Sequence, residues 1–338
     1  MKKAAFFNTL KDNTVKCFLC NHMCVIPEGK RGKCGVRENN GGILESLVYG
    51  RLAATSADPI EKKPLFHFLP GSISYSISTV GCNFKCLHCQ NFHISQYPHM
   101  HNGDIVGETY RPSDVIGAAT LSSCKSISYT YVEPTVFFEF AYDCAVLAKQ
   151  HDIKNIFVSN GYMSKEAAIE LSKVIDAINI DIKSFSDSFY REICGAHLKP
   201  VLDNVERLYN RGVWVEITTL IIPGLNDSKK ELTEIANFIK GIDPDIPWHI
   251  TGFYPCFQLN NISPTPVSTL DMARQIGLDI GLNYVYQGNR PGHGGEDTIC
   301  PYCNRTLIKR TGFNIITNNM DSTGTCPFCG KPISGRWK

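Results

Sequence analysis

Short apolar runs and helical segments alternate six times through the middle of this 338-residue chain. Such runs are typical of strands buried on both faces, and intervening helices predict right-handed parallel βαβ units. The predicted strands lie at 75–79, 126–131, 155–159, 177–182, 214–222 and 248–254, with one more at 284–287; the predicted helices lie at 112–121, 136–150, 165–174, 201–212 and 229–239. We therefore predict an α/β fold, a partial (β/α)6 TIM-like barrel with its ligand site at the carboxyl ends of the strands.

Most of the fifteen cysteines fall into three tight sets, as metal ligands do. The sets are Cys17, Cys20, Cys24 and Cys34; Cys82, Cys86 and Cys89; and Cys300, Cys303, Cys326 and Cys329. The other four, Cys124, Cys144, Cys194 and Cys256, stand among apolar residues, which favours core packing. This grouping predicts three parts: residues 1–70 as a Cys-rich module with a linker, 71–290 as the barrel, and 291–338 as a second metal module.

The central set has the spacing Cys-x3-Cys-x2-Cys and follows the first predicted strand, on the ligand face of the barrel. Three thiolates can hold three irons of a [4Fe–4S] cluster, which leaves the fourth iron open to a small molecule. Zinc would need a fourth ligand. His88 lies between two of the cysteines, a place better suited to packing against a ligand than to binding zinc.

The two outer sets each supply four soft ligands. Cys17, Cys20, Cys24 and Cys34 could close around zinc or around a second iron–sulfur cluster. We favour structural zinc there, with His22 as a possible substitute ligand. The two Cys-x2-Cys pairs at 300–303 and 326–329 predict a zinc ribbon or a rubredoxin-like iron site, and zinc is again favoured.

The central cysteine loop resembles the signature of radical S-adenosylmethionine (SAM) enzymes, and Glu133-Pro134 and Asp181-Ile182-Lys183, at later strand ends, extend the resemblance. In that family the open iron chelates the methionine amino and carboxylate groups of SAM. An electron from the cluster then cleaves SAM to methionine and a 5′-deoxyadenosyl radical. The resemblance thus implies a [4Fe–4S] cluster and SAM as cofactors, and an electron donor such as ferredoxin or flavodoxin.

The resemblance also assigns contacts with SAM. The predicted cofactor-binding residues are His88, Glu133, Asn160, Gly161, Asp181, Lys183 and His249. Glu133 stands where the family has a Gly-Gly-Glu-Pro-like turn near the SAM amino group, although Tyr131 and Val132 replace both glycines. Residues 159–162 resemble a Thr-Asn-Gly turn near the ribose and carboxylate.

Lys183 resembles a lysine that pairs with the methionine carboxylate in glycyl-radical activating enzymes, and His249 resembles a sixth-strand histidine of the same enzymes. Structural roles compete with each assignment. Glu133 could be a solvated loop residue, Asp181 could simply pair with Lys183, and His249 could be a satisfied core residue.

The whole chain is similar to the AmmeMemoRadiSam-system radical SAM enzymes, which are often described as pyruvate formate-lyase activating enzyme-like. The similarity rests on Cys-Gly-Val-Arg at 34–37, Asp-Pro-Ile-Glu-Lys-Lys-Pro at 58–64, Cys-Gln-Asn at 89–91 and Pro-Gly-Leu-Asn-Asp at 223–227. It implies hydrogen abstraction from an unidentified substrate linked to Memo-type and AMMECR-type proteins. A glycyl-radical activase is the alternative, and a non-catalytic iron–sulfur, zinc-binding or electron-transfer protein is the second alternative.

Composition narrows the remaining choices. The net charge of +2, with 20% charged residues, gives no reason to expect nucleic acid as a partner. No apolar run approaches the roughly 18 residues that a membrane helix needs, and the first residues lack the apolar core of a signal peptide. We therefore expect no membrane association and a cytoplasmic location, in an anaerobic or well-reduced setting because an open cluster is oxygen-labile.

Overall fold

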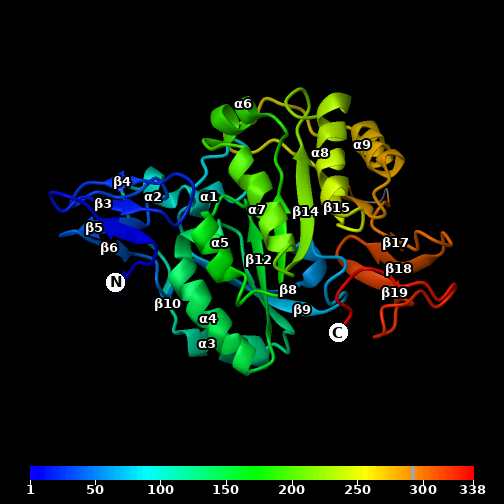
Figure 1. The fold of residues 1–338 in the computed structure, drawn as a ribbon, viewed down its shortest axis with the longest axis horizontal. Coiled ribbons are helices and arrows are strands. Elements are labelled where there is room, and N and C mark those ends of the chain that lie inside the picture. Colours follow the sequence, from blue (N-terminus) through cyan, green and yellow to red (C-terminus); the bar gives the residue numbers. More distant parts are fainter. Residues whose placement is uncertain (291–293) are drawn as a thin grey trace.

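The computed structural model describes residues 1–290 and 294–338, and a mostly parallel sheet forms its centre (Figure 1). The strand order is β16-β15-β14-β13-β12-β11-β9-β8. Neighbours from β9 to β16 are parallel, and β8 is an antiparallel edge strand. The strands are β8 (Ala54–Pro59), β9 (Ile73–Ser78), β11 (Ser126–Tyr129), β12 (Lys154–Ser159), β13 (Ala177–Asp181), β14 (Trp214–Ile221), β15 (Trp248–Gly252) and β16 (Val285–Gly288). The predicted parallel strands are confirmed, and β8 is an addition.

Helices connect these strands, and α4, α5, α7 and α8 lie in front of the sheet in Figure 1. The longer helices are α3 (Pro112–Leu121), α4 (Phe138–Gln150), α5 (Lys165–Leu171), α7 (Lys199–Tyr209), α8 (Lys229–Ile242) and α9 (Val267–Ile280). Serines cap two of them, because Ser164 accepts from Ala167 N and Ser228 accepts from Glu231 N. Shorter turns are α1 (Phe92–Ser95), α2 (Tyr97–Met100), α6 (Asp187–Phe189) and the 3-10 and π turns η1 (Ile60–Lys62), η2 (Pro134–Phe137) and η3 (Tyr190–Cys194).

The two ends of the chain form small antiparallel sheets on opposite sides of the central sheet in Figure 1. The amino-terminal strands are β1 (Lys2–Lys3), β2 (Phe7–Thr9), β3 (Val15–Cys17), β4 (Val25–Ile26), β5 (Arg37–Asn40) and β6 (Ile43–Ser46); β7 (Arg51–Leu52) pairs with β10 (Glu108–Thr109). The carboxyl-terminal strands are β17 (Thr298–Ile299), β18 (Thr306–Thr311) and β19 (Asn314–Asn318). The predicted boundary at 290/291 falls beside residues 291–293, which lie outside the described residues.

Buried polar side chains within the central sheet form hydrogen bonds between neighbouring strands. Buried serines of neighbouring strands share a hydrogen bond of 2.6 Å between Ser74 and Ser128, and Thr218 donates to Asn179 over 2.9 Å. Such groups are stable in the interior because each has a partner. In the parts of the chain that the structure describes, no helix is both long and apolar enough to cross a membrane.

Candidate active site

The loop that carries Cys82, Cys86 and Cys89 follows β9 and lies at the carboxyl edge of the sheet. Two backbone hydrogen bonds hold the loop against the π turn η3. Lys85 N donates to Cys194 O over 2.9 Å, and Leu87 N donates to Ile193 O over 3.0 Å. The three thiols therefore stand on a firmly held loop, at the edge where parallel α/β sheets bind their ligands.

The protein environment keeps these thiols protonated in the absence of a metal. Burial raises the pKa of Cys82 well above its usual value, and a hydrogen bond with Cys194 together with burial does the same for Cys86. Burial also raises the pKa of Cys89, although Ser95, 3.2 Å from its sulfur, opposes the shift. A metal centre must therefore displace protons from all three thiols when it binds.

Asn83 links the cysteine loop to two predicted cofactor residues. Its Oδ1 accepts from Asn160 Nδ2 over 2.8 Å, and Asn160 N donates to Glu133 over 2.7 Å. The buried Glu133 carboxylate also accepts from Thr135 N and from Ser159 Oγ. Burial raises the pKa of Glu133 despite these donors. Glu133 thus holds the turn that presents Asn160.

Two nearby residues, Gly161 and Tyr131, have positive φ angles. Gly161 has φ of +70°, and a Cβ there would lie 2.9 Å from Ile180 Cγ2, so a side chain has no room. Tyr131, which replaces a family glycine, adopts φ of +65°. Its hydroxyl donates to Asp58 over 2.6 Å, which ties it to the strand β8. The backbone conformation that glycine would favour is therefore kept despite the substitution.

Lys183, Asp181 and His88 form a second polar group beside the loop. Lys183 Nζ lies 3.0 Å from Asp181 Oδ2. Burial acts to lower the pKa of Lys183, but the charge of Asp181 is the largest opposing cause, and the pKa is raised. Burial and the charge of Lys183 lower the pKa of His88 to about 3, so the His88 ring is neutral.

Unpartnered buried atoms in these groups favour a polar ligand. His88 Nδ1 and Asn83 Nδ2 are buried without a hydrogen-bond partner. Buried polar groups without partners are rare and destabilising, so such atoms are expected where a ligand completes the network. The donor groups, the ammonium of Lys183 and the three thiols together suit a cluster with a bound amino acid moiety.

His249 lies among different residues. It is the second residue of β15, near the amino end of that strand, and its Nε2 lies 2.6 Å from Glu216 Oε2. Its ring packs edge-on against Phe66 and stacks on Tyr286. Glu216 also accepts from the backbone N of Phe66 and of His67. These contacts give His249 a partner within the sheet interior, unlike His88.

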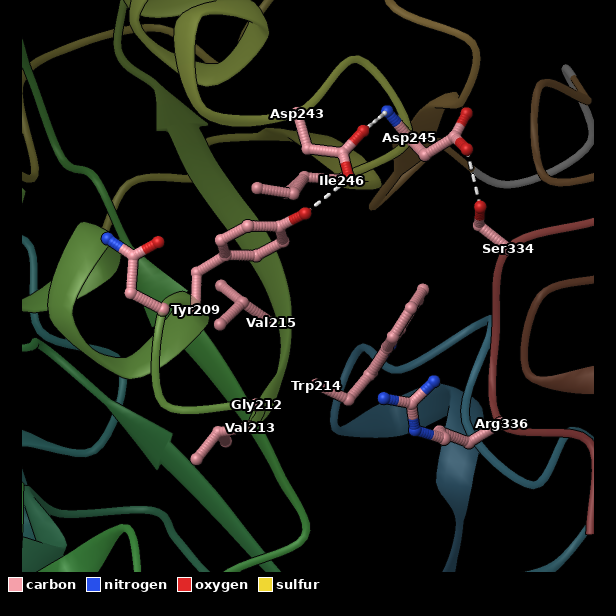
Figure 2. Close-up of a pocket in the computed structure, with 11 residues that line it drawn as sticks. Tyr209, Gly212, Val213, Trp214, Val215, Asp243, Asp245, Ile246, Ser334 and Arg336 are labelled. Atoms are coloured by element: carbon pink, nitrogen blue, oxygen red, sulfur yellow. Dashed lines mark hydrogen bonds between the residues drawn. The ribbon is translucent and has the colours of Figure 1, made fainter.

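A cavity of about 450 Å³ lies at the other end of the sheet (Figure 2). Trp214 begins β14, and Asp245 and Ile246 precede β15, so the cavity is at the amino ends of these strands. Ser334 and Arg336 of the carboxyl-terminal tail close one side of it. The cysteine loop lies at the carboxyl ends of the strands, where parallel α/β sheets bind their ligands. This cavity is therefore separate from the cysteine loop.

The four carboxyl-terminal cysteines are already arranged for one metal ion. Their ligand atoms all lie within 4.8 Å of one another, with sulfur–sulfur distances of 3.8 Å for Cys300–Cys329 and 3.7 Å for Cys303–Cys326. Sulfurs bound tetrahedrally at about 2.3 Å from zinc are about 3.8 Å apart. The set can therefore bind zinc or iron.

Sequence reasoning missed two residues of the site. Asn83 was passed over because it lies between cysteines, and Cys194 was assigned to the core. Cys194 is a core residue, as predicted, but the π turn also places it near Cys86, where it contributes to the raised pKa of that thiol. A π turn is common at functional sites, but it has no clear sequence pattern.

Comparisons with known proteins agree with this site. The family model "Radical SAM superfamily" matches residues 76–239. The chain contains a radical SAM domain. It is 44% identical to protein MJ0808 of Methanocaldococcus jannaschii over 335 residues, 98% of this chain and 99% of that protein. It is 26% identical to the pyruvate formate-lyase-activating enzyme of Clostridium pasteurianum over 188 residues, 53% of this chain and 77% of that enzyme.

A solved structure shares the fold. Streptococcus suis SuiB bound to S-adenosylmethionine gives a TM-score of 0.50 at 13% identity, covering 68% of this chain and 53% of SuiB. Superfamily membership and the activating-enzyme relatives show that the chain is an enzyme, and the family implies a [4Fe–4S] cluster and SAM.

Proposed function

We propose that this radical SAM enzyme belongs to the AmmeMemoRadiSam-system subfamily and abstracts hydrogen from a substrate linked to Memo-type or AMMECR-type proteins. Within this proposal the parallel sheet is a partial barrel, and Cys82, Cys86 and Cys89 hold the cluster. When bound, the cluster and SAM supply a 5′-deoxyadenosyl radical. The observation that carries the proposal is the convergence of the three thiols with Lys183, His88 and Asn83 at the carboxyl edge.

Each nearby residue has a role in this proposal. Lys183 supplies a positive charge for the methionine carboxylate, and Asp181 orients the ammonium. Asn83 Nδ2 and His88 Nδ1 offer polar atoms to SAM, while Glu133 holds Asn160 and Gly161 in place for the ribose. His249 holds Glu216 and Phe66 in the sheet interior and does not contact SAM directly.

The experiment is anaerobic SAM cleavage. The protein is reconstituted with iron and sulfide, SAM and dithionite are added, and 5′-deoxyadenosine and methionine are measured by mass spectrometry. Cleavage should be lost in Cys86→Ala and kept in Cys124→Ala, a matched buried cysteine outside the site. A wild-type protein with a full cluster that binds SAM and yields no 5′-deoxyadenosine, with or without candidate partners, would contradict the proposal.

SAM binding gives a second readout. Lys183→Met should weaken SAM binding about tenfold, because a charge-assisted hydrogen bond is lost in a buried place. Lys165→Met, at the exposed start of α5, is the control. Equal affinities by equilibrium dialysis would remove Lys183 from the site.

A glycyl-radical activase is the second candidate, favoured by the likeness to the activating enzyme of Clostridium pasteurianum. The two candidates differ in the substrate. A glycyl radical detected by EPR on an added glycyl-radical enzyme would support the activase, whereas a modified Memo-type or AMMECR-type partner would support the first candidate.

A further inference from the structure

The four amino-terminal cysteines converge on one place. Cys17 N donates to Cys24 O over 2.8 Å, which closes the loop between them. A Cβ on Gly32, two residues before Cys34, would lie 3.7 Å from Cys24 Sγ, so the segment that carries Cys34 packs on the same loop. The backbone therefore brings the segments that carry these cysteines together in one small module.

Their spacing differs from that of a site for a single ion. Within residues 1–290 and 294–338, the carboxyl-terminal set is the one group of three or more ligand atoms that all lie within 4.8 Å of one another. The amino-terminal set and the set of Cys82, Cys86 and Cys89 are both wider than this. In an iron–sulfur cluster thiolates on different irons are held farther apart than thiolates on one ion. Both sets therefore differ from the single-ion arrangement of the carboxyl-terminal set.

A buried guanidinium without enough partners lies beside these sulfurs. Arg37 is 1% exposed, and its Nη2 donates to Glu139 Oε1 and to Ala5 O, each over 2.7 Å. Its Nε and Nη1 have no partner. Arg37 follows Cys34 by three residues, and the Ala5 carbonyl that it contacts precedes Phe6, whose carbonyl accepts from Phe18 N, next to Cys17, over 2.8 Å. The sulfurs of an anionic cluster would accept from these two N–H groups.

The same set packs directly against the radical SAM loop. His22, between Cys20 and Cys24, donates from Nε2 to Asn83 O over 2.7 Å. Cys20 forms a β-bridge with Met163, two residues after Gly161. A Cβ on Gly81 would lie 2.8 Å from Cys34 O. The amino-terminal set therefore contacts both the loop of Cys82, Cys86 and Cys89 and the turn that contains Asn160 and Gly161.

We propose that Cys17, Cys20, Cys24 and Cys34 hold an iron–sulfur cluster that passes electrons to the cluster of Cys82, Cys86 and Cys89. In each transfer the amino-terminal cluster loses one electron and is oxidised, and the second cluster gains that electron and is reduced. A low-potential one-electron donor of the ferredoxin or flavodoxin class resupplies the first cluster. The transfer rests on the proposed function, whereas the identity of the amino-terminal centre does not.

The first test removes the radical SAM cluster and counts what is left. The variant Cys82→Ala/Cys86→Ala/Cys89→Ala is reconstituted anaerobically with iron, sulfide and zinc. We expect about two to four acid-labile sulfides per chain and an EPR signal after reduction with dithionite. Zinc without sulfide at this site would overturn the proposal.

Two added substitutions locate the sulfide. Adding Cys20→Ala should abolish it, whereas adding Cys303→Ala should remove the carboxyl-terminal metal and leave the sulfide unchanged. Should the triple variant fail to fold, wild-type protein serves instead: sulfide clearly above the about four per chain of a single [4Fe–4S] cluster supports the proposal, and about four overturns it.

The second test measures electron delivery. Reduced flavodoxin is mixed with wild type and with Cys24→Ala, and reduction of the radical SAM cluster is followed by rapid-freeze EPR. We expect the rate to fall at least about tenfold in the variant while SAM affinity is unchanged. An unchanged rate overturns the relay. Sulfide in the triple variant, with no SAM cleavage in wild type, would instead reject the proposed function and keep the amino-terminal cluster.

Discussion

The two ends of this chain each carry four cysteines, yet the two sets differ in spacing and in neighbours. The carboxyl-terminal sulfurs lie 3.7 and 3.8 Å apart in pairs. The amino-terminal sulfurs are spread wider and lie beside Arg37, a charged group with unpartnered atoms. Ligand number alone therefore says little about a metal site, because the spacing of the ligands decides which centre can bind.

The two sets also contact different parts of the enzyme. His22 of the amino-terminal set contacts the radical SAM loop at Asn83. The carboxyl-terminal module contacts residues 66–69, where His67 Nδ1 donates to Ser334 O over 2.7 Å and Arg336 N donates to His67 O over 2.7 Å. That module borders the cavity at the amino ends of the strands (Figure 2). We expect it to support the fold rather than the chemistry.

The largest expected effect is local unfolding after loss of the carboxyl-terminal metal ion, with SAM cleavage retained. Cys326→Ser should release the carboxyl-terminal ion and unfold the sheet of β17, β18 and β19, because small metal modules obtain most of their folding free energy from the metal. Metal analysis and limited proteolysis will show the loss. SAM cleavage should stay within about twofold of wild type, since the cysteine loop is not touched. A complete loss of SAM cleavage in otherwise folded protein would contradict the expectation that the carboxyl-terminal module supports the fold rather than the chemistry.

Breaking the ion pair beside the amino-terminal set should have the next largest effect. Arg37→Met leaves Glu139 buried without its cation and should lower the free energy of unfolding by about 3 to 5 kcal/mol. Lys199→Met removes an exposed pair with Asp203 and should cost less than about 1 kcal/mol. Anaerobic urea unfolding measures both. Equal losses would mean that Arg37 is not held as the structure shows.

Two glycines test how tightly each cysteine set is packed. Gly81→Ala should lower the free energy of unfolding by about 3 kcal/mol, because its Cβ would lie 2.4 Å from Val36 Cγ1. Gly330→Ala, in the carboxyl-terminal set, has open space around it and a φ of +72°, so only the left-handed backbone costs about 1 kcal/mol. The reverse ranking in thermal or urea unfolding would contradict the close contact at Gly81.

The smallest expected effect is a pH dependence at the carboxyl-terminal contact. Burial lowers the pKa of His67 to about 4, so the unfolded chain binds a proton near pH 6.5 that the folded chain does not. Stability should therefore fall by about 2 kcal/mol between pH 7 and pH 5 from this group. His67→Gln should flatten this part of the profile of unfolding free energy against pH. An unchanged slope would mean that folding does not lower the pKa of His67.

Particular residues show where sequence prediction succeeded and where it stopped. The parallel strands were predicted because each is a compact apolar run, as in β12 and β14. The edge strand β8 was missed because Ala-Thr-Ser-Ala-Asp-Pro at 54–59 has no apolar alternation; its pairing with β9 defines it. Helix α9 was missed because Gly277 weakens its pattern. That glycine is needed for close packing, since a Cβ there would lie 2.9 Å from Val285.

For the candidate site, too, some features were predicted from the sequence and others were decided only by the tertiary structure. The spacing of Cys82, Cys86 and Cys89 is a local property, so the sequence by itself determined the superfamily, the cluster loop and the carboxyl edge on which it stands. Contacts between residues far apart in the chain were decided only by the tertiary structure. Asn83 meets Asn160, Cys86 meets Cys194, and His22 meets the radical SAM loop because packing of the sheet and the amino-terminal module brings them together. Such pairings leave no spacing pattern, because they depend on how distant strands and loops assemble.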